Sequence, residues 1–155
     1  MQEKQIDILE QTRRILVNVI GELSLEQLNT IPVGFNNNIA WNFAHLVVSQ
    51  QILCYRLSGL ECNVEEAIIA RYIRGTAPDP QHPMTETTFR KLRAIFLENP
   101  GKLRADYRKG AFKQYKGITT STGVTLADID MAIAYNTMHE GLHLGYILAL
   151  KRAIG

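Results

Sequence analysis

The residues with the clearest chemical potential are two histidines four positions apart, His139 and His143. They lie in an apolar segment with helical periodicity, and four residues advance a helix by about 400°, so both imidazoles share one face, one turn apart. Two imidazoles placed in this way can bind one metal ion without bending the backbone. The same spacing also occurs on solvated helix faces that bind nothing, so the pair alone leaves both interpretations open.

Glu140 offers a second interpretation, because residues 139–143 read HEGLH and fit the H-E-x-x-H motif of zinc metalloproteases. In those enzymes the glutamate acts on the metal-bound water. Glu140 lies about 100° around the helix from His139, an offset that does not exclude the same role here. A protease also needs a substrate cleft and a third ligand downstream, and only twelve residues follow His143. We therefore favour a metal site of another kind.

A third histidine, His45, lies in the middle of another long apolar segment. Taken alone it is most simply a buried core residue. Together with the pair it forms a set of three on two helices, which leaves a fourth coordination position open for water or substrate, as in catalytic zinc sites. Asn42 and Ser49, at offsets of three and four, share the face of His45. Cys54, nine residues on, lies on the opposite face.

The fourth histidine, His82, lies in a segment with three prolines between residues 78 and 83, which excludes regular structure. A fourth ligand from this loop is conceivable. Because no helix aims its side chain, we interpret His82 as an exposed loop residue.

Four long segments have the periodicity of amphipathic helices: residues 4–22, 38–58, 85–110 and 125–152. The apolar residues expected on the core-facing stripe of the first are Ile8, Leu9, Ile15, Leu16, Val19, Ile20 and Leu23. Residues 99–101 (Asn-Pro-Gly) interrupt the third without shifting its register, so we expect a kinked or briefly broken helix. Thr125 is the expected N-cap of the fourth.

No segment predicts a convincing strand or an internal repeat. The pattern therefore predicts an all-α fold, an antiparallel-type helical bundle in which the connection 59–84 crosses the outside. Metal sites in such bundles form in the core from facing helices, so His45 can meet His139 and His143.

The chain of 155 residues is expected to form a single domain, residues 1–155. A formal net charge of +2 is too small to indicate a nucleic-acid partner. No apolar run is long enough to span a membrane, and the N-terminus has no signal-peptide pattern. Two cysteines, Cys54 and Cys62, form no disulfide framework and suit a reducing compartment, so a cytoplasmic location is expected.

With these residues assembled, the chain resembles the DinB-like superfamily of small four-helix bundles. The most specific part is the last helix, where the family typically carries a histidine, a second histidine four later and a glycine two beyond, here His139, His143 and Gly145. The family's remaining histidine corresponds to His45. The resemblance implies an up-down-down-up bundle with a long crossover connection, frequent dimers, and a divalent metal (zinc, nickel or similar) held by the three histidines.

The resemblance also suggests a function. Characterised relatives include bacillithiol S-transferases and mycothiol-dependent maleylpyruvate isomerases, in which the metal activates a small thiol. We therefore expect a metal-dependent thiol S-transferase or isomerase that acts on a small thiol and an electrophile. The alternative is a non-catalytic stress or sensing protein whose metal fastens two helices. From their helical offsets, the candidates for substrate binding are Asn42, Ser49, Asn136 and Tyr146. Leu144 and Tyr146 stand where many members have Arg and Gln.

A homodimer is also expected. Relatives are often dimers, and a bundle of this length has more apolar side chains than one core axis can take. The residues that suggest this surplus are Ile8, Ile15, Val47, Ile52 and Phe89.

Overall fold

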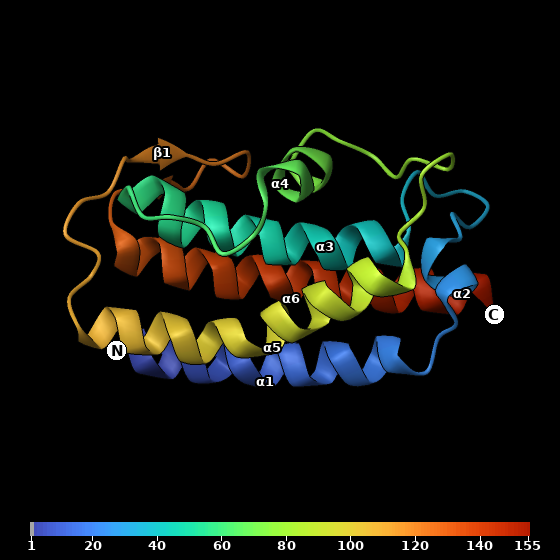
Figure 1. Ribbon diagram of the computed structural model, residues 1–155, viewed down its shortest axis with the longest axis horizontal. Coiled ribbons are helices and arrows are strands. Elements are labelled where there is room, and N and C mark those ends of the chain that lie inside the picture. Colours follow the sequence, from blue (N-terminus) through green and yellow to red (C-terminus); the bar gives the residue numbers. More distant parts are fainter. Residues whose placement is uncertain (1) are drawn as a thin grey trace.

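Four long helices form the body of the protein, for which a computed structural model describes residues 2–155. They are α1 (Gln2–Gly21), α3 (Ile39–Gln50), α5 (Glu86–Arg108) and α6 (Ile129–Ile154). Helices α1 and α3 each pack against both α5 and α6. In Figure 1, α1 and α6 run in one direction, and α3 and α5 run back in the other. The predicted all-α bundle is thereby confirmed.

The shorter elements lie at the edges of this bundle. They are α2 (Leu25–Asn29), α4 (Glu66–Tyr72) and the strands β1 (Ile118–Thr119) and β2 (Thr125–Leu126). The two strands pair antiparallel, with Ile118 opposite Leu126. Figure 1 shows β1 and α4 along the α3 side of the bundle, away from α1. Among residues 2–155, no helix combines the length and the apolar character needed to cross a bilayer.

Side-chain caps set most of the helix starts. Ser24 and Gln27 form the capping box at α2, and the side chains of Asn38 and Thr85 accept backbone N–H groups at the starts of α3 and α5. The prediction of Thr125 as the cap of the last helix was wrong. Thr125 pairs in β2, and α6 begins after Asp128, whose side chain accepts the Met131 N–H.

Helix α3 is buried along its whole length, because α2, α4, α5 and α6 all pack against it. Beyond Gln50 the chain continues as a π-helical turn, η1 (Gln51–Tyr55), and a 3-10 turn, η2 (Arg56–Ser58). It ends at Gly59, whose φ of 70° favours glycine.

The predicted stripe on α1 was partly wrong. Ile8 and Ile15 are 53% and 52% exposed, whereas Arg13 is fully buried. The face that α1 presents to the core carries Arg13 between Leu9 and Leu16, at helical offsets of four and three. An arginine in the core needs partners that no local pattern reveals.

Those partners come from the three other long helices. Arg13 Nη2 lies 2.5 Å from Glu140 Oε1 on α6 and 3.0 Å from Gln50 Oε1 on α3. Its Nε donates to Glu140 Oε2 at 3.0 Å, and Asn136 Nδ2 donates to Glu140 Oε1 at 3.0 Å. Both Arg13 and Glu140 have 0% side-chain exposure. A charged pair in the core is therefore shared among three helices.

Helix α5, the remaining long helix, contacts the Arg13–Glu140 ion pair through a backbone carbonyl. Pro100 lies inside α5 and has no N–H to donate to the carbonyl of Phe96, four residues back. Arg13 Nη1 donates to that carbonyl at 2.7 Å and replaces the missing donor. The guanidinium also lies 4.2 Å from the centre of the Phe96 ring. Helix α5 is thus continuous through Pro100, and Figure 1 shows it changing direction along its length, as expected for a kinked helix.

We predict that Glu140→Gln strongly destabilises the protein, because it leaves the Arg13 charge buried without a counter-charge. Breaking a buried ion pair from one side typically costs about 3–5 kcal/mol. The matched control is Glu86→Gln, which removes a carboxylate from the solvent-exposed pair with Arg90 and should cost less than about 1 kcal/mol. Urea denaturation of both variants measures the difference. Equal losses would show that the buried pair has no special role.

Candidate metal centre

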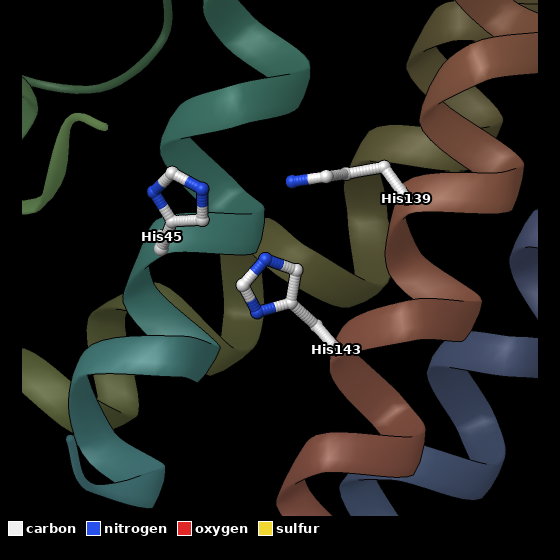
Figure 2. A group of neighbouring side chains, drawn as sticks. All are labelled: His45, His139 and His143. Carbon is white, nitrogen blue, oxygen red and sulfur yellow. The ribbon is translucent and has the colours of Figure 1, made fainter. Parts of the chain in front are cut away.

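Three histidines from two helices meet between α3 and α6. His45 comes from α3, and His139 and His143 come from α6 (Figure 2). One ring nitrogen of each lies within 4.8 Å of the corresponding nitrogens of the other two. The ring centres are 5.4 Å apart for His45 and His139, 5.0 Å for His45 and His143, and 4.6 Å for His139 and His143. The structure thus brings together the three residues that the sequence singled out.

The tautomer of His45 follows from its contacts. Its Nδ1 lies 2.7 Å from the backbone carbonyl of Tyr72, which can only accept a hydrogen bond, so Nδ1 carries the proton. Its Nε2 is therefore unprotonated and accepts the Ser49 hydroxyl at 3.1 Å. Tyr72 is the last residue of α4. The connection 59–84 thus contributes a backbone group to the site, which the sequence did not reveal.

The tautomer of His143 follows in the same way. Its Nδ1 lies 2.7 Å from Asn42 Oδ1. The orientation of the Asn42 amide is set by its Nδ2, which donates to the Asn38 carbonyl at 2.7 Å and to Asn37 Oδ1 at 3.1 Å. Asn42 therefore presents an acceptor, His143 Nδ1 must donate, and His143 Nε2 carries a free lone pair.

His139 differs from the other two. Its Nδ1 is buried and has no hydrogen-bond partner in the part of the chain that the structure describes. Its ring stacks against Tyr135, with centres 6.0 Å apart and planes at 16°. A buried polar atom without a partner is rare and often marks an ion or water that the protein does not itself supply.

These contacts fit a divalent metal ion. Metal-binding histidines typically donate their second ring N–H to a carbonyl or an amide oxygen, which fixes the ring and leaves the other nitrogen for the metal. His45 and His143 both have this arrangement. Trp41 stacks on His45 at 4.7 Å with planes 11° apart and holds that ring in place.

Burial keeps the three imidazoles neutral. Removal from water, with a smaller effect of the neighbouring imidazoles, lowers the pKa of His139 to about 4 and that of His143 to about 3. Burial also lowers the pKa of His45, against the opposing effect of its hydrogen bond to Tyr72. Neutral imidazoles are the form that binds metal, so the site is ready for an ion at neutral pH.

The proposed substrate-binding residues divide into three kinds. Asn42 positions His143 through its Nδ1, whereas the Ser49 hydroxyl donates to His45 Nε2, the nitrogen that a metal would take. Asn136 is fully buried and directs its amide nitrogen to Glu140. Tyr146 is 37% exposed and lines a pocket of about 390 Å³ that borders His143.

Three other residues considered in the sequence do not belong to the histidine cluster. The Glu140 carboxylate is held by Arg13 and faces the core, which removes it as the base of a metalloprotease. Cys54 is fully buried, and burial raises the pKa of its thiol to about 12. His82 is exposed, and its Nδ1 bonds to Asp79 at 2.7 Å.

The comparison with known proteins agrees with this geometry. A family model described as the DinB superfamily matches residues 8–147, which include all three histidines. The chain belongs to the DinB superfamily. No curated protein matches it. The DinB superfamily is metal-binding, and this member carries a cluster of His45, His139 and His143 in which a metal can bind.

We predict that the metal-free protein loses stability as the pH falls from 6.5 to 5. In this window the unfolded chain, whose histidines titrate near 6.5, takes up protons that the buried imidazoles do not. Each such histidine contributes a slope of about 1.4 kcal/mol per pH unit. Above pH 6.5 the histidines are neutral in the unfolded chain as well, so they no longer change the free energy of unfolding.

Urea denaturation in the presence of a chelator measures the slope. His143→Gln should reduce the slope by about the amount that one proton contributes. His82→Gln, at an exposed histidine, should leave the slope unchanged. If both variants keep the wild-type slope, burial does not hold His143 neutral.

Proposed function

We propose that this DinB superfamily protein binds a divalent metal ion through His45, His139 and His143 and uses it to activate a small thiol for S-transfer or isomerisation. The observation that carries the proposal is the pair of fixed tautomers. The Tyr72 carbonyl and the Asn42 amide oxygen hold the Nδ1 protons, which leaves Nε2 of His45 and His143 unprotonated.

Zinc or nickel suits this site best. Imidazole nitrogen is a good ligand for both ions, whereas magnesium and calcium prefer oxygen ligands. The ligand cluster among residues 2–155 consists of histidines alone, without a carboxylate. Three neutral ligands leave the full charge of the ion available to a fourth ligand.

A bound divalent ion lowers the pKa of a thiol and so favours the nucleophilic thiolate at neutral pH. The protein's own residues orient the reaction. Asn42 and Tyr72 hold two imidazoles in place, and Ser49 offers a hydroxyl next to His45. Tyr146 lines the pocket where the body of a substrate would lie.

The pocket also favours catalysis over a purely structural metal. A metal that only fastens α3 to α6 needs no free space beside its ligands. Here a pocket of about 390 Å³ is lined by His143, one of the three proposed ligands, and provides room for a substrate beside it. The two free cysteines, Cys54 and Cys62, suit a reducing cytoplasm, which we propose as the location.

We predict about one metal ion per chain in protein purified without a metal-affinity column. Replacing His45, His139 or His143 with Ala should remove most of the bound metal, because two imidazoles hold an ion far less tightly than three. His82→Ala is the control and should retain the ion, since His82 is exposed and bonded only to Asp79. Elemental analysis by mass spectrometry measures the content. Equal metal in all four variants would end the proposal.

The chemistry is tested next with the metal-loaded protein. Consumption of a small thiol is followed with 1-chloro-2,4-dinitrobenzene as the electrophile. The thiolate forms a C–S bond to the ring, the C–Cl bond breaks, and chloride leaves with the bonding pair. His82→Ala should retain any activity and His143→Ala should lose it. Full metal loading without transfer to any of a panel of electrophiles would favour the sensing or stress-protein alternative.

We also propose a homodimer, in which a second copy covers an apolar face on α6 and α1. Five apolar side chains suggested a surplus over what one core can take. Of these, Val47 is buried and Ile52 and Phe89 pack at the core edge, but Ile8 and Ile15 are exposed. The exposed residues that continue this face along α6 are Met131, Met138, Gly141, Gly145, Leu148 and Ala149. We call this set the α6 face.

Two features support a second copy as the occupant of the α6 face. No exposed charge lies on α6 between Asp130 and Lys151, since Glu140 is buried. A Cβ at Gly141 or Gly145 would meet nothing within 4 Å, so packing within the chain gives no reason for helix-weakening glycines there. Helices α1 and α6 together present a face about 27 Å long and 20 Å wide. Covering this face on both copies would bury roughly 1,000 Å² in total, the lower bound for a stable interface.

We predict a mass of twice 17.5 kDa by light scattering at tens of micromolar. Met138→Lys should shift the protein toward monomer, because it places a charge in the α6 face. Leu97→Lys, at an exposed apolar position on α5, should leave the dimer intact. A wild-type protein that is only monomeric would exclude the dimer.

A further inference from the structure

The pocket beside His143 restricts what can bind there. It is lined by Asn37, Trp41 and Asn42 from the start of α3 and the preceding loop, and by Leu142, His143 and Tyr146 from α6. Its volume is about 390 Å³, which suits a small molecule. Phe35 contacts Tyr146, with ring centres 5.9 Å apart, and extends the aromatic wall.

No charged side chain lines this pocket. Among the described residues that form it, none is Asp, Glu, Lys or Arg. Arg71 lies over the Tyr72 ring at 5.3 Å and lines a separate, much smaller hollow. An acidic or basic group on a ligand would therefore find no partner of opposite charge in the wall.

Most polar atoms of the wall are already engaged. Asn42 donates to the Asn38 carbonyl and accepts from His143. Asn37 Oδ1 accepts from the Asn38 N–H and from Asn42 Nδ2. The indole N–H of Trp41 donates to Thr76 at 3.0 Å. What remains for a ligand is the Trp41 indole ring, the Leu142 side chain and two neutral polar groups, the Asn37 amide nitrogen and the Tyr146 hydroxyl.

We infer that the molecule bound in this pocket has an uncharged, apolar or aromatic body, and that its only anionic atom is the one that approaches the three histidines. The inference rests on the proposed function, since a divalent ion at the histidines is the one positive charge that the site would offer. A second anionic group on the ligand would leave water without a positively charged partner in the wall, which is costly. The pocket therefore selects simple apolar or aromatic thiols against carboxylated ones.

A matched pair of probes tests the inference: benzyl mercaptan and 4-(mercaptomethyl)benzoate, which differ by one carboxylate. Binding to the metal-loaded protein is followed by the fluorescence of Trp41, the single tryptophan of the chain, which lines the pocket. We expect benzyl mercaptan to bind at least tenfold more tightly. Equal affinities, or tighter binding of the carboxylate, would overturn the inference.

Two arginine variants locate the effect. Tyr146→Arg places a cation in the pocket wall and should reverse the preference, so that the carboxylated thiol binds more tightly. Val33→Arg adds the same charge at a fully exposed loop position that does not line the pocket, and should keep the wild-type preference. If both variants shift the preference equally, long-range charge and not the pocket decides it, and the inference fails.

Metal content separates this inference from the proposed function. Each variant is analysed for bound metal before the titration. If the wild type binds no metal, the proposed function fails, and the pocket is tested in the metal-free protein with benzyl alcohol against benzoate. Tighter binding of benzyl alcohol, measured by Trp41 fluorescence, then supports the uncharged pocket, and tighter binding of benzoate refutes it.

Discussion

The buried ion pair between Arg13 and Glu140 is the constraint on which the rest of the structure depends. A guanidinium away from water must place its donors on acceptors of good geometry, because each charge left unpaired in the core costs several kcal/mol. Here those acceptors come from α6, α3 and α5, and they include the Phe96 carbonyl that Pro100 leaves without a donor. A rotation of any one long helix would break part of this arrangement. The pair therefore fixes the rotation of all four helices.

That rotation also places the histidines. Glu140 follows His139 directly, and Gln50 follows Ser49, which bonds to His45. Because neighbouring residues on a helix differ by about 100°, directing Glu140 and Gln50 toward Arg13 turns His139 and His45 toward the space between α3 and α6. There one ring nitrogen of each histidine lies within 4.8 Å of those of the other two. The metal site is thus organised by an interaction in which the metal has no part.

Burial and hydrogen bonding prepare the site chemically as well as geometrically. Desolvation keeps the imidazoles neutral, and the Tyr72 carbonyl and Asn42 select the tautomers that leave Nε2 unprotonated on His45 and His143. Protons therefore compete with a metal only at acidic pH. The residues that line the adjoining pocket include no Asp, Glu, Lys or Arg. A site of this kind concentrates positive charge at a bound ion and offers apolar surface around it.

The sequence by itself determined what depends on residues within about one helical turn. The four long helices and the shared face of His139 and His143 follow from local periodicity. The exposure of His82 follows from its place in a proline-rich loop.

Only the tertiary structure decided which distant groups meet. Arg13 is separated from Glu140 by 127 positions, and no local pattern distinguishes it from a solvated arginine. The Tyr72 carbonyl at His45, the pairing that takes Thr125 into a strand, and the exposure of Ile8 and Ile15 likewise depend on how the helices pack. Periodicity gives the face on which a residue lies, but the partner that makes a polar residue stable in the core comes from another helix.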